Sequence, residues 1–517
     1  MNTLLIYPNS PQNLGDLADS SVRVTGKKAY LPPLGLITVA ALLPQDWPMK
    51  LVDCSFQVVS QQDWSEAGLV VISGTIVQIA GIIDVIREAK SRGKIVAVGG
   101  PGIFHFHREA LEAGADFVVR GEAEVTVPQL LECLRKKEFG ILIENESPAD
   151  ITLSPIPRYD LLDLDAYVDL SVQFSRGCPY RCEFCDVTLM FGRAIRTKNP
   201  EQMLAELQRI YDLGWRKQAH FVDDNFIGRP VRAKAFLKQL IAWNDRRPRP
   251  LEFYTYSSVN LAANGEIMEL MVRAGFTMVM LGIETTDREV LKSSRKFQNT
   301  LDLEEACRRI NKAGLEIMAL IILGFDGETP RRDMRVIEFA RKTHIPEVVV
   351  SLLHALNGTI LWERLKKEGR LLETAKNKLG DWHNLEMNFV PTRPQEQIFE
   401  EFVAIHKDLY DPGNYLDRAY EHFAAMDPPP VVGRFRLPDL YELRILLITI
   451  WKQGVVYPTR KKYWKLSIAA FRSLSRDRFA HFIRTVVKME RYVDRRKELE
   501  RQLGKFSRPE HRISQSR

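Results

Sequence analysis

Short apolar segments alternate with longer amphipathic segments from the N-terminus to about residue 352. Residues 3–7, 69–73 and 95–99 have the length and composition of buried strands, whereas residues 34–43 and 79–92 have helical spacing. Strands and helices in alternation form parallel sheets that are covered by helices. The sequence therefore predicts an α/β protein.

The first region, residues 1–142, is predicted to be a doubly wound, Rossmann-like domain. Ligands of such sheets bind beyond the carboxyl ends of the strands, and small residues there let a large ligand approach the backbone. The same glycines could serve only to make tight strand-to-helix turns, and their spacing leaves both interpretations open. The candidate residues at these strand ends are Ser73, Gly74, Gly99, Gly100, Pro101, Gly121 and Glu122.

The middle of the chain is predicted to be a second α/β domain. Residues 143–168 include the proline-containing stretch 154–159 and are predicted to be a linker. Six strand-helix units then predict a partial (βα)6, TIM-like barrel over residues 169–370. Its expected strands are residues 170–175, 219–222, 252–256, 278–283, 316–323 and 347–352.

The last region, residues 371–517, lacks strand signals and is predicted to be helical. Helices are expected at residues 395–410, 437–452 and 463–505, with the prolines at 428–430 as a breaker. Residues 451–517 contain 19 Lys and Arg against 6 Asp and Glu, a net charge of +13, whereas the whole chain carries +7. This basic region could contact an anionic membrane surface, pack on the barrel, or remain a solvated face.

Neither end of the chain carries a membrane or export signal. The N-terminal residues lack the basic and apolar regions of a secretory signal. The apolar run 445–451 is far shorter than the roughly 20 residues that cross a bilayer. The protein is therefore predicted to be cytoplasmic, with a peripheral membrane contact through its basic tail as an option.

Three of the six cysteines, Cys178, Cys182 and Cys185, follow the first strand of the predicted barrel, where barrel enzymes have their active sites. Thiolates are ligands of iron-sulfur clusters and of zinc, and a site held wholly by protein normally uses four. The other cysteines stand alone in the sequence, so three thiolates would leave one iron of a [4Fe-4S] cluster open. A structural zinc site completed by His220 is the alternative.

The C-x3-C-x2-C spacing, with Phe184 just before the last cysteine, closely resembles the signature of the radical S-adenosylmethionine (SAM) superfamily. In that family the open iron chelates SAM, and reduction of the cluster splits SAM to a 5′-deoxyadenosyl radical. Residues 221–226, 257–261, 282–285 and 323–326 resemble the strand-end motifs of the same superfamily. The resemblance implies that SAM binds near Phe184, Asp223, Ser257, Glu284 and Gly324.

Two of the residues in these motifs also have a simpler interpretation. Glu284 could be a surface carboxylate at the end of a strand. Asp224 could cap the segment that follows it. No catalytic acid or base is assigned, because radical abstraction depends on positioning and on the exclusion of water.

One branch of the superfamily has a doubly wound cobalamin-binding domain in front of the barrel. Residues 32–36, 99–101 and 121–124 are similar to recurrent segments of that branch, which implies that the strand ends of the first domain bind cobalamin. The D-x-H-x-x-G motif, whose histidine ligates cobalt in many cobalamin proteins, is absent from residues 9–15. His105 and His107 are predicted to be ordinary loop residues. A base-off cobalamin without a histidine ligand is favoured over a domain that has lost the cofactor.

Residues 222–228, 282–285 and 296–300 and the basic tail resemble the part of this branch that includes the hopanoid C-2 methylases. This resemblance implies methylation of an unactivated carbon in a hydrophobic lipid or polycyclic substrate. A reductase, ferredoxin or flavodoxin would supply the electron, and no nucleic-acid partner is expected. The alternatives are a radical cyclase or rearrangement enzyme resembling the anaerobic magnesium-protoporphyrin ester cyclase and, less favoured, a non-catalytic cluster and corrin sensor.

Overall fold

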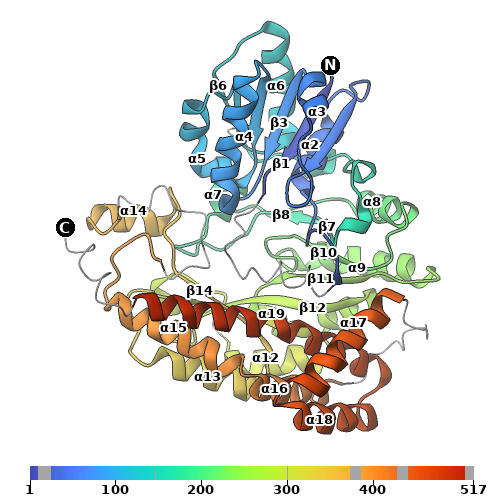
Figure 1. Cartoon of the computed structure of the whole chain (residues 1–517), viewed down its shortest axis with the longest axis vertical. Coiled ribbons are helices and arrows are strands. Elements are labelled where there is room, and N and C mark those ends of the chain that lie inside the picture. Colours follow the sequence, from blue (N-terminus) through green and yellow to red (C-terminus); the bar gives the residue numbers. More distant parts are fainter. Residues whose placement is uncertain are drawn as a thin grey trace. The chain divides into compact units, whose positions relative to one another are not determined.

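The computed structural model describes residues 1–9, 22, 25–145, 147–299, 301–372, 386–427 and 440–506 (Figure 1). The chain divides into two compact units. The first unit is made of residues 1–14, 27–232 and 355–382, and the second of residues 15–26, 233–354 and 383–517. The predicted N-terminal loop 9–15 lies almost wholly outside the described residues.

The first unit contains a parallel six-stranded sheet with the order β2-β1-β3-β4-β5-β6. Its strands are apolar because both faces are covered by helices, and Leu5, Val70 and Val96 are fully buried. The strand order reverses between β1 and β3, which is where ligands of doubly wound sheets bind. The strands are β1 (Thr3–Tyr7), β2 (Met49–Asp53), β3 (Leu69–Ser73), β4 (Ile95–Gly99), β5 (Phe117–Arg120) and β6 (Ile141–Glu144).

The helices of this sheet confirm the predicted Rossmann-like class and add elements that the sequence pattern did not predict. They are α2 (Leu34–Leu42), α3 (Gln61–Glu66), α4 (Ile79–Ser91), α5 (Pro101–Glu112) and α6 (Ala123–Lys136). Strand β6 pairs with β5 and follows Gly140, so the first sheet extends to Glu144, within the predicted linker.

The predicted strand 170–175 is divided in the structure. β7 (Leu170–Val172) joins a sheet with β10 (Gln218–Phe221), whereas β8 (Ser175–Arg176) leaves it and pairs antiparallel with β9 (Arg196–Thr197). This small hairpin encloses the cysteine loop and α7 (Val187–Phe191). The first unit also contains α8 (Pro200–Asp212) and, after the last strand of the chain, α14 (Ile360–Lys367).

The second unit contains β11 (Glu252–Ser257), β12 (Phe276–Glu284), β13 (Glu316–Leu323) and β14 (Glu347–Leu352), paired in parallel. Together with β7 and β10 they belong to one six-stranded sheet whose order follows the chain, as expected for a partial barrel. The helices that separate these strands are α9 (Pro230–Asp245), α10 (Gly265–Ala274), α11 (Arg288–Ser293), α12 (Leu303–Lys312) and α13 (Arg332–Thr343).

The C-terminal region is helical, as predicted, but its elements differ from those expected. The predicted single helix 463–505 is wrong, because the chain is extended at Leu474 and begins a new helix at Arg476. The predicted breaker at 428–430 and the predicted helix start at 437 lie outside the described residues. The helices are α15 (Gln395–Leu409), α16 (Pro412–Ala424), α17 (Leu440–Trp451), a π-helix (Lys452–Val456), α18 (Arg460–Ser473) and α19 (Arg476–Phe506).

Helix α19 packs on α15 and α16 and pairs its charges with the first residues of three strands. Arg484 pairs with Glu252 of β11, and His481 Nδ1 lies 2.6 Å from Glu316 Oε1 of β13. Glu347 of β14 is paired with both Lys488 (2.8 Å) and Arg491 (2.7 Å). Half of the basic tail therefore packs against the amino ends of the sheet, which is one of the alternatives that the sequence left open.

A search of the described residues finds no helix whose length and hydropathy would let it span a bilayer.

Candidate active site

The three cysteines of the predicted cluster site lie on the loop between β8 and α7. All are free thiols, with Cys182 buried and Cys178 and Cys185 partly buried. Gly177, directly before Cys178, has φ +95°, and a Cβ there would lie 2.8 Å from the carbonyl oxygen of Ala194. Only glycine lets the loop pass so close to the backbone beyond α7. The entrance to the cysteine loop is therefore fixed by the fold.

Two carboxylates at the end of β10, Asp223 buried and Asp224 partly buried, hold the chain where it enters this loop. Asp223 accepts hydrogen bonds from the backbone N–H groups of Phe174 (3.2 Å) and Ser175, and Asp224 accepts one from Gly177 (2.8 Å). Asp224 therefore binds the cysteine loop, and the structure shows no cap on the segment after it. Burial raises the pKa of Asp223 to about 7 and that of Asp224 to about 6.

The donor chemistry of the loop fits an iron-sulfur cluster better than zinc. Three thiols on one loop match a cubane in which each thiolate binds a different iron and one iron stays open. A zinc ion instead needs ligands that converge on one point, and among the described residues no three His, Cys, Asp or Glu side chains do so. His220 is buried, and burial lowers its pKa to about 3. The zinc alternative therefore has no support in the described structure.

A buried group of charges joins the cysteine loop to the first sheet. Arg176 of β8 contacts Glu122 (2.6 Å) and Glu124 (3.0 Å), and Arg196 of β9 contacts Glu122 (2.8 Å). Glu122 also accepts a hydrogen bond from the N–H of Ala149 (2.9 Å), and its side chain is 1% exposed. The carboxylate of Glu122 is thus occupied by protein partners, so a contact with cobalamin at this position would involve its backbone.

His105 provides a second connection between the first sheet and the cysteine loop. Its Nε2 atom lies 2.9 Å from Asp186, the residue after Cys185, and its Nδ1 atom lies 3.1 Å from the carbonyl oxygen of Asn357. Both ring nitrogens are therefore engaged by protein, which agrees with the prediction that His105 is no cobalt ligand. His105 and His107 lie on α5 and not in a loop, because Pro101 starts the helix directly after Gly100.

The loop is also held by the segment that follows the last strand. The carbonyl oxygen of Glu183 accepts a hydrogen bond from Leu361 N–H (2.8 Å), and the Glu183 carboxylate pairs with Arg364 of α14 (3.0 Å). Phe184, next to Glu183, is partly buried. The cysteine loop is thus fixed from β10, from α5 and from α14.

The glycines at the ends of β3, β4 and β5 have identifiable partners within the first unit. Gly100 has φ +92°, and a Cβ on it would collide with Ser73 Oγ. The N–H of Gly102 donates to the carbonyl of Gly74 (3.0 Å), and a Cβ on Gly121 would collide with Asn145. These close backbone approaches support the interpretation as tight turns. The loops nevertheless present backbone and small side chains at the switch point of the sheet, which fits a large planar ligand.

Three predicted SAM residues lie at the ends of strands in the second unit. Glu284 ends β12 with φ +60°, and its carboxylate pairs with Lys296 at 2.6 Å. It is 7% exposed, so the alternative of a surface carboxylate is wrong. Gly324 has φ +102°, and a Cβ there would lie 2.6 Å from Met387 Cε. Ser257 is buried at the end of β11.

Sequence reasoning missed the polar partners of these strand ends. Lys296 lies in a segment that resembles the family, yet its pairing with Glu284 could not be seen from spacing. Glu328 accepts a hydrogen bond from Gly324 N–H (2.9 Å), and burial raises the pKa of Glu328 to about 7. Arg332 is 1% exposed and donates to Thr285 and Thr286. Lys296 and Glu328 come from the segments that follow their own strands, whereas Arg332 comes from α13, after the next strand along the chain.

Comparison with known proteins identifies the family. Three family models match the chain: a B12 binding domain over residues 21–131, the radical SAM superfamily over residues 172–340, and a domain of unknown function over residues 359–505. A hopanoid C-2 methylase of Rhodopseudomonas palustris is 32% identical over 90% of this chain and 88% of its own length. The chain is a cobalamin-binding radical SAM enzyme.

The enzyme is also 44% identical to an uncharacterized methyltransferase of Synechocystis, over 98% of this chain and 94% of that protein. Its fold is that of the radical SAM methyltransferase TsrM of Kitasatospora setae, solved with cobalamin and a [4Fe-4S] cluster bound. The two structures share 15% identity and a TM-score of 0.60, over 97% of this chain and 100% of the other. The family implies a [4Fe-4S] cluster, SAM and cobalamin as the cofactors of the enzyme.

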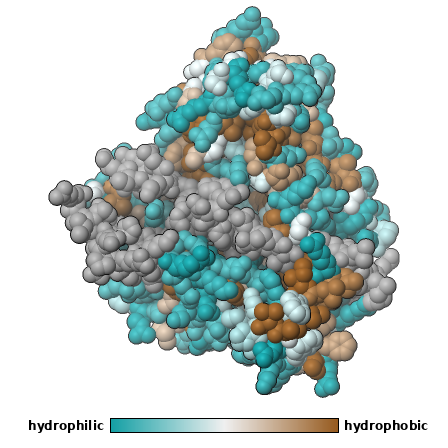
Figure 2. Space-filling view, in the orientation of Figure 1, coloured by the Kyte–Doolittle hydropathy of each residue, from teal (hydrophilic) through white to brown (hydrophobic). Residues whose placement is uncertain are grey.

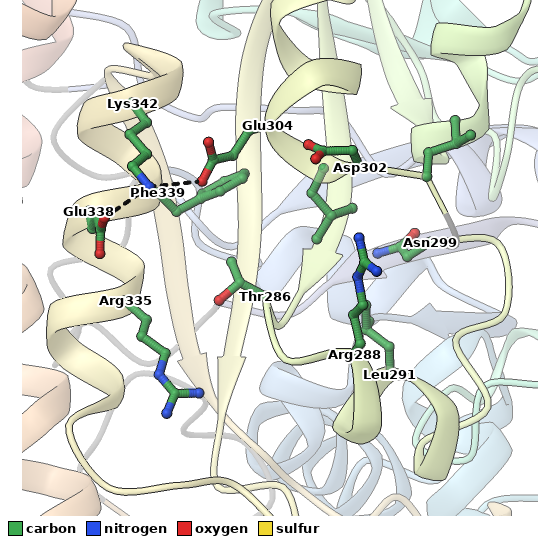
Figure 3. Close-up of a pocket in the computed structure, with 12 residues that line it drawn as sticks. Thr286, Arg288, Leu291, Asn299, Asp302, Glu304, Arg335, Glu338, Phe339 and Lys342 are labelled. Atoms are coloured by element: carbon green, nitrogen blue, oxygen red, sulfur yellow. Dashed lines mark ion pairs between the residues drawn. The ribbon is translucent and has the colours of Figure 1, made fainter.

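A cavity of about 330 Å³ lies in the second unit, among α11, α12 and α13 (Figure 3). Two of its cations are paired: Lys342 contacts Glu338 (2.9 Å) and Glu304 (3.5 Å), and Arg335 contacts Asp287 (3.3 Å). None of the predicted site residues lines it. Its lining residue Asn299 donates to the carbonyl oxygens of Gly282 (3.0 Å) and Ile283 (2.9 Å), so the cavity borders the strand end that carries Glu284.

Proposed function

We propose that the enzyme methylates an unactivated carbon of a hydrophobic substrate, a lipid or a polycyclic molecule. The observation that carries the proposal is the similarity to the hopanoid C-2 methylase, which extends over nine-tenths of this chain and so includes all of its regions. A likeness limited to the barrel would support only radical SAM chemistry.

The cofactors supply, when bound, an electron, a hydrogen-abstracting radical and a methyl group. The residues of the chain bind and position them. Cys178, Cys182 and Cys185 would hold the cluster, and Asp224, Glu183 and Asp186 fix the loop that carries these thiols. A loop held at both ends would keep the three thiols, and so the cluster that they would hold, in a constant position.

The SAM-binding residues proposed from the resemblance are compatible with the local geometry. Glu284 keeps a buried carboxylate next to Lys296, and Gly324, with φ +102°, has a backbone conformation that favours glycine. Ser257 and Phe184 would add a hydroxyl and an aromatic surface. Asp223 differs from these four, because its carboxylate is already bonded to backbone N–H groups, so we assign it a positioning role beside its expected SAM contact.

Cobalamin would bind at the carboxyl ends of β1 and β3 to β5, at the switch point of the first sheet. The residues proposed to approach it are the strand-end set of small residues and the backbone of Glu122: Ser73, Gly74, Gly99, Gly100, Pro101 and Gly121. His105 contributes no cobalt ligand here, because Asp186 and Asn357 occupy its ring nitrogens. This arrangement supports a cobalamin bound without a protein histidine.

Three further assignments belong to the proposal. The domain boundaries are those expected from the sequence, at 142, 168 and 370, with the first sheet extended to Glu144. A reductase, ferredoxin or flavodoxin would deliver the electron. The alternative of radical ring closure or rearrangement would yield a product without added methyl mass. The non-catalytic sensor is not retained, because the high-coverage relatives are methyltransferases.

The test is anaerobic reconstitution of the full chain with iron, sulfide and hydroxocobalamin, followed by metal and corrin analysis and incubation with SAM and a strong reductant. We expect about four irons and one corrin per chain, with formation of 5′-deoxyadenosine. Cys182→Ala should lose iron and 5′-deoxyadenosine. Cys133→Ala, a partly exposed cysteine on α6, is the matched control and should lose neither. Iron and 5′-deoxyadenosine without corrin would refute the methylase mechanism, and zinc in place of iron would refute the cluster.

A further inference from the structure

Helix α18 turns its apolar side chains outward. Trp464, Ile468 and Phe471 are 43%, 48% and 73% exposed, and their spacing of four and three residues places them on one face. The buried face of the same helix carries Tyr463, Ser467 and Ala470. A helix on the surface of a globular protein normally has the opposite pattern, with its large apolar residues inside. The exposed face of α18 is therefore unusual.

The same pattern continues through α17 and the π-helix. Leu443, Leu447, Trp451 and Val455 follow one another at every fourth position, and all are exposed. These four residues, with Val456, Trp464, Ile468 and Phe471, are called the apolar face. Figure 2 shows hydrophobic surface where α17 and α18 lie in Figure 1. Contiguous apolar surface of this kind marks an interaction site more often than a scattered set of exposed residues does.

The turn between α17 and α18 is held in place by polar contacts beneath the apolar face. Glu490 of α19 accepts hydrogen bonds from Gln453 Nε2 (2.6 Å) and from the Tyr457 hydroxyl (2.8 Å). The indole N–H of Trp464 donates to the carbonyl of Gly454 (3.0 Å). These three hydrogen bonds fix the turn, so Val455 and Val456 are exposed as part of a defined structure.

Positive charge borders the apolar face. Helix α18 contains five basic residues and no acidic residue. Of these, Lys462 pairs with Asp417. Within the part of the chain that the structure describes, no ion pair is found for Arg460, Lys461, Lys465 or Arg472, and all four are exposed. Apolar and aromatic side chains flanked by long cations are the pattern of helices that lie at a membrane interface.

We propose that the apolar face docks on the surface of an anionic lipid bilayer. Charge complementarity decides this occupant, because a second copy of the same face would bring the basic residues of two α18 helices together. Trp451 and Trp464 suit the headgroup level of a bilayer, and the unpaired cations suit anionic lipids. This inference rests on the proposed function in one respect only: it gives a membrane-resident substrate a route to the enzyme.

The experiment is sedimentation of the reconstituted full-length enzyme with vesicles of phosphatidylglycerol and phosphatidylcholine, compared with vesicles of phosphatidylcholine alone. We expect binding to the anionic vesicles that weakens as salt is raised. Lys461→Glu/Lys465→Glu/Arg472→Glu should weaken it at least roughly a hundredfold, since the loss of each cation near an anionic surface costs about a factor of five and the added glutamates are repelled. Arg87→Glu/Lys238→Glu/Lys292→Glu changes three exposed cations elsewhere and should have little effect.

A second pair of variants tests the apolar side chains. Leu447→Ser/Ile468→Ser/Phe471→Ser should weaken binding at least tenfold, whereas Val58→Ser/Leu153→Ser/Val231→Ser, which changes even more exposed apolar residues elsewhere, should not. Equal sedimentation of the unchanged enzyme with both kinds of vesicle would overturn the inference. So would a concentration-dependent dimer in ultracentrifugation that only the apolar-face variant abolishes, without any vesicle binding.

The outcome for docking can be separated from the outcome for the proposed function. Vesicle binding needs no turnover, and the 5′-deoxyadenosine assay contains no vesicles. An enzyme that binds anionic vesicles but retains no corrin would contradict the methylase proposal and support docking. An enzyme that holds all of its cofactors but does not bind the vesicles would support the methylase proposal and contradict docking.

Discussion

Helices α18 and α19 are neighbours in the chain and both are basic, yet they use their residues in opposite ways. In α19 the apolar residues Phe482, Val486 and Met489 are fully buried, and three of its cations pair with glutamates that begin strands. In α18 the large apolar residues are exposed and most cations have no ion pair among the described residues. Net charge alone therefore cannot assign a role to a basic tail. The role is assigned by the group with which each charged side chain pairs.

The physical reason lies at the two ends of the sheet. Glu252, Glu316 and Glu347 stand at the amino ends of their strands, and in α/β barrels that end contributes to stability, while the carboxyl end carries the active site. A basic helix packed against this row of carboxylates is a structural element. A basic helix without such a row beneath it is free to meet an external partner.

The largest loss of stability is expected when the Glu347 carboxylate is removed. Glu347→Ala leaves the buried Arg491 and the partly buried Lys488 without their carboxylate, and we expect the free energy of unfolding of the second unit to fall by about 3–5 kcal/mol. Denaturant unfolding followed by tryptophan fluorescence measures this. Glu289→Ala, at an exposed carboxylate on α11, is the control and should change stability by less than about 0.5 kcal/mol. A similar small change for Glu347→Ala would mean that α19 is not held by its charges.

The pH dependence of stability should provide a second test of the ion pairs of Glu347. Burial by itself would raise the pKa of Glu347, but Lys488 and Arg491 outweigh burial, so its pKa lies below the ordinary value of 4.5. Its stabilising contribution is therefore complete above pH 4.5 and is lost as the pH falls through the lowered pKa. Thermal unfolding between pH 7 and pH 3 should show a smaller decrease for Glu347→Gln than for the unchanged enzyme. Parallel curves for the two proteins would contradict this assignment.

The pair between Arg484 and Glu252 should matter less, because both side chains are about 40% exposed. We expect Arg484→Ala to lower the free energy of unfolding by about 0.2–1 kcal/mol. Measurement in low and high salt separates the contribution of charge, since an exposed pair is screened. A decrease in the free energy of unfolding as large as that of Glu347→Ala would show that side-chain exposure does not predict the strength of these ion pairs.

The smallest effect on stability is expected in α18. Ile468→Ser/Phe471→Ser removes exposed apolar surface and should leave the free energy of unfolding within about 0.5 kcal/mol of the unchanged value. The same variant should bind anionic vesicles more weakly. If it unfolded several kcal/mol more easily, its side chains would be part of the core, and the contrast with α19 would disappear.

Most strands could be predicted because buried parallel strands are short, apolar and separated by helices of clear period. The structure departs from the prediction where local pattern is a poor guide. Residues 170–175 alternate apolar and polar side chains as one continuous strand would, yet β8 leaves the sheet at Ser175 to pair with Thr197 of β9. The break between α18 and α19 falls at Leu474, with no proline or glycine to signal it.

The candidate site was predictable to the same extent. The cysteines were found because cluster ligands lie close together in sequence. The contacts that fix their loop were not, since His105 lies 81 residues from Asp186 and Glu183 lies 181 residues from Arg364. Spacing carries no information about such pairs, and only the fold brings them together.

The charges that join Glu122 to Arg176 and Arg196 have a consequence for how proteins of this architecture can be built from parts. Separating the first sheet from the cysteine hairpin would leave the Glu122 carboxylate and both guanidinium groups without the partners that they have in the fold. Each part would then lack its counter-ions, so neither could be exchanged for an unrelated domain unless Glu122, Arg176 and Arg196 were also changed. The first sheet and the cysteine loop would therefore have to be inherited together.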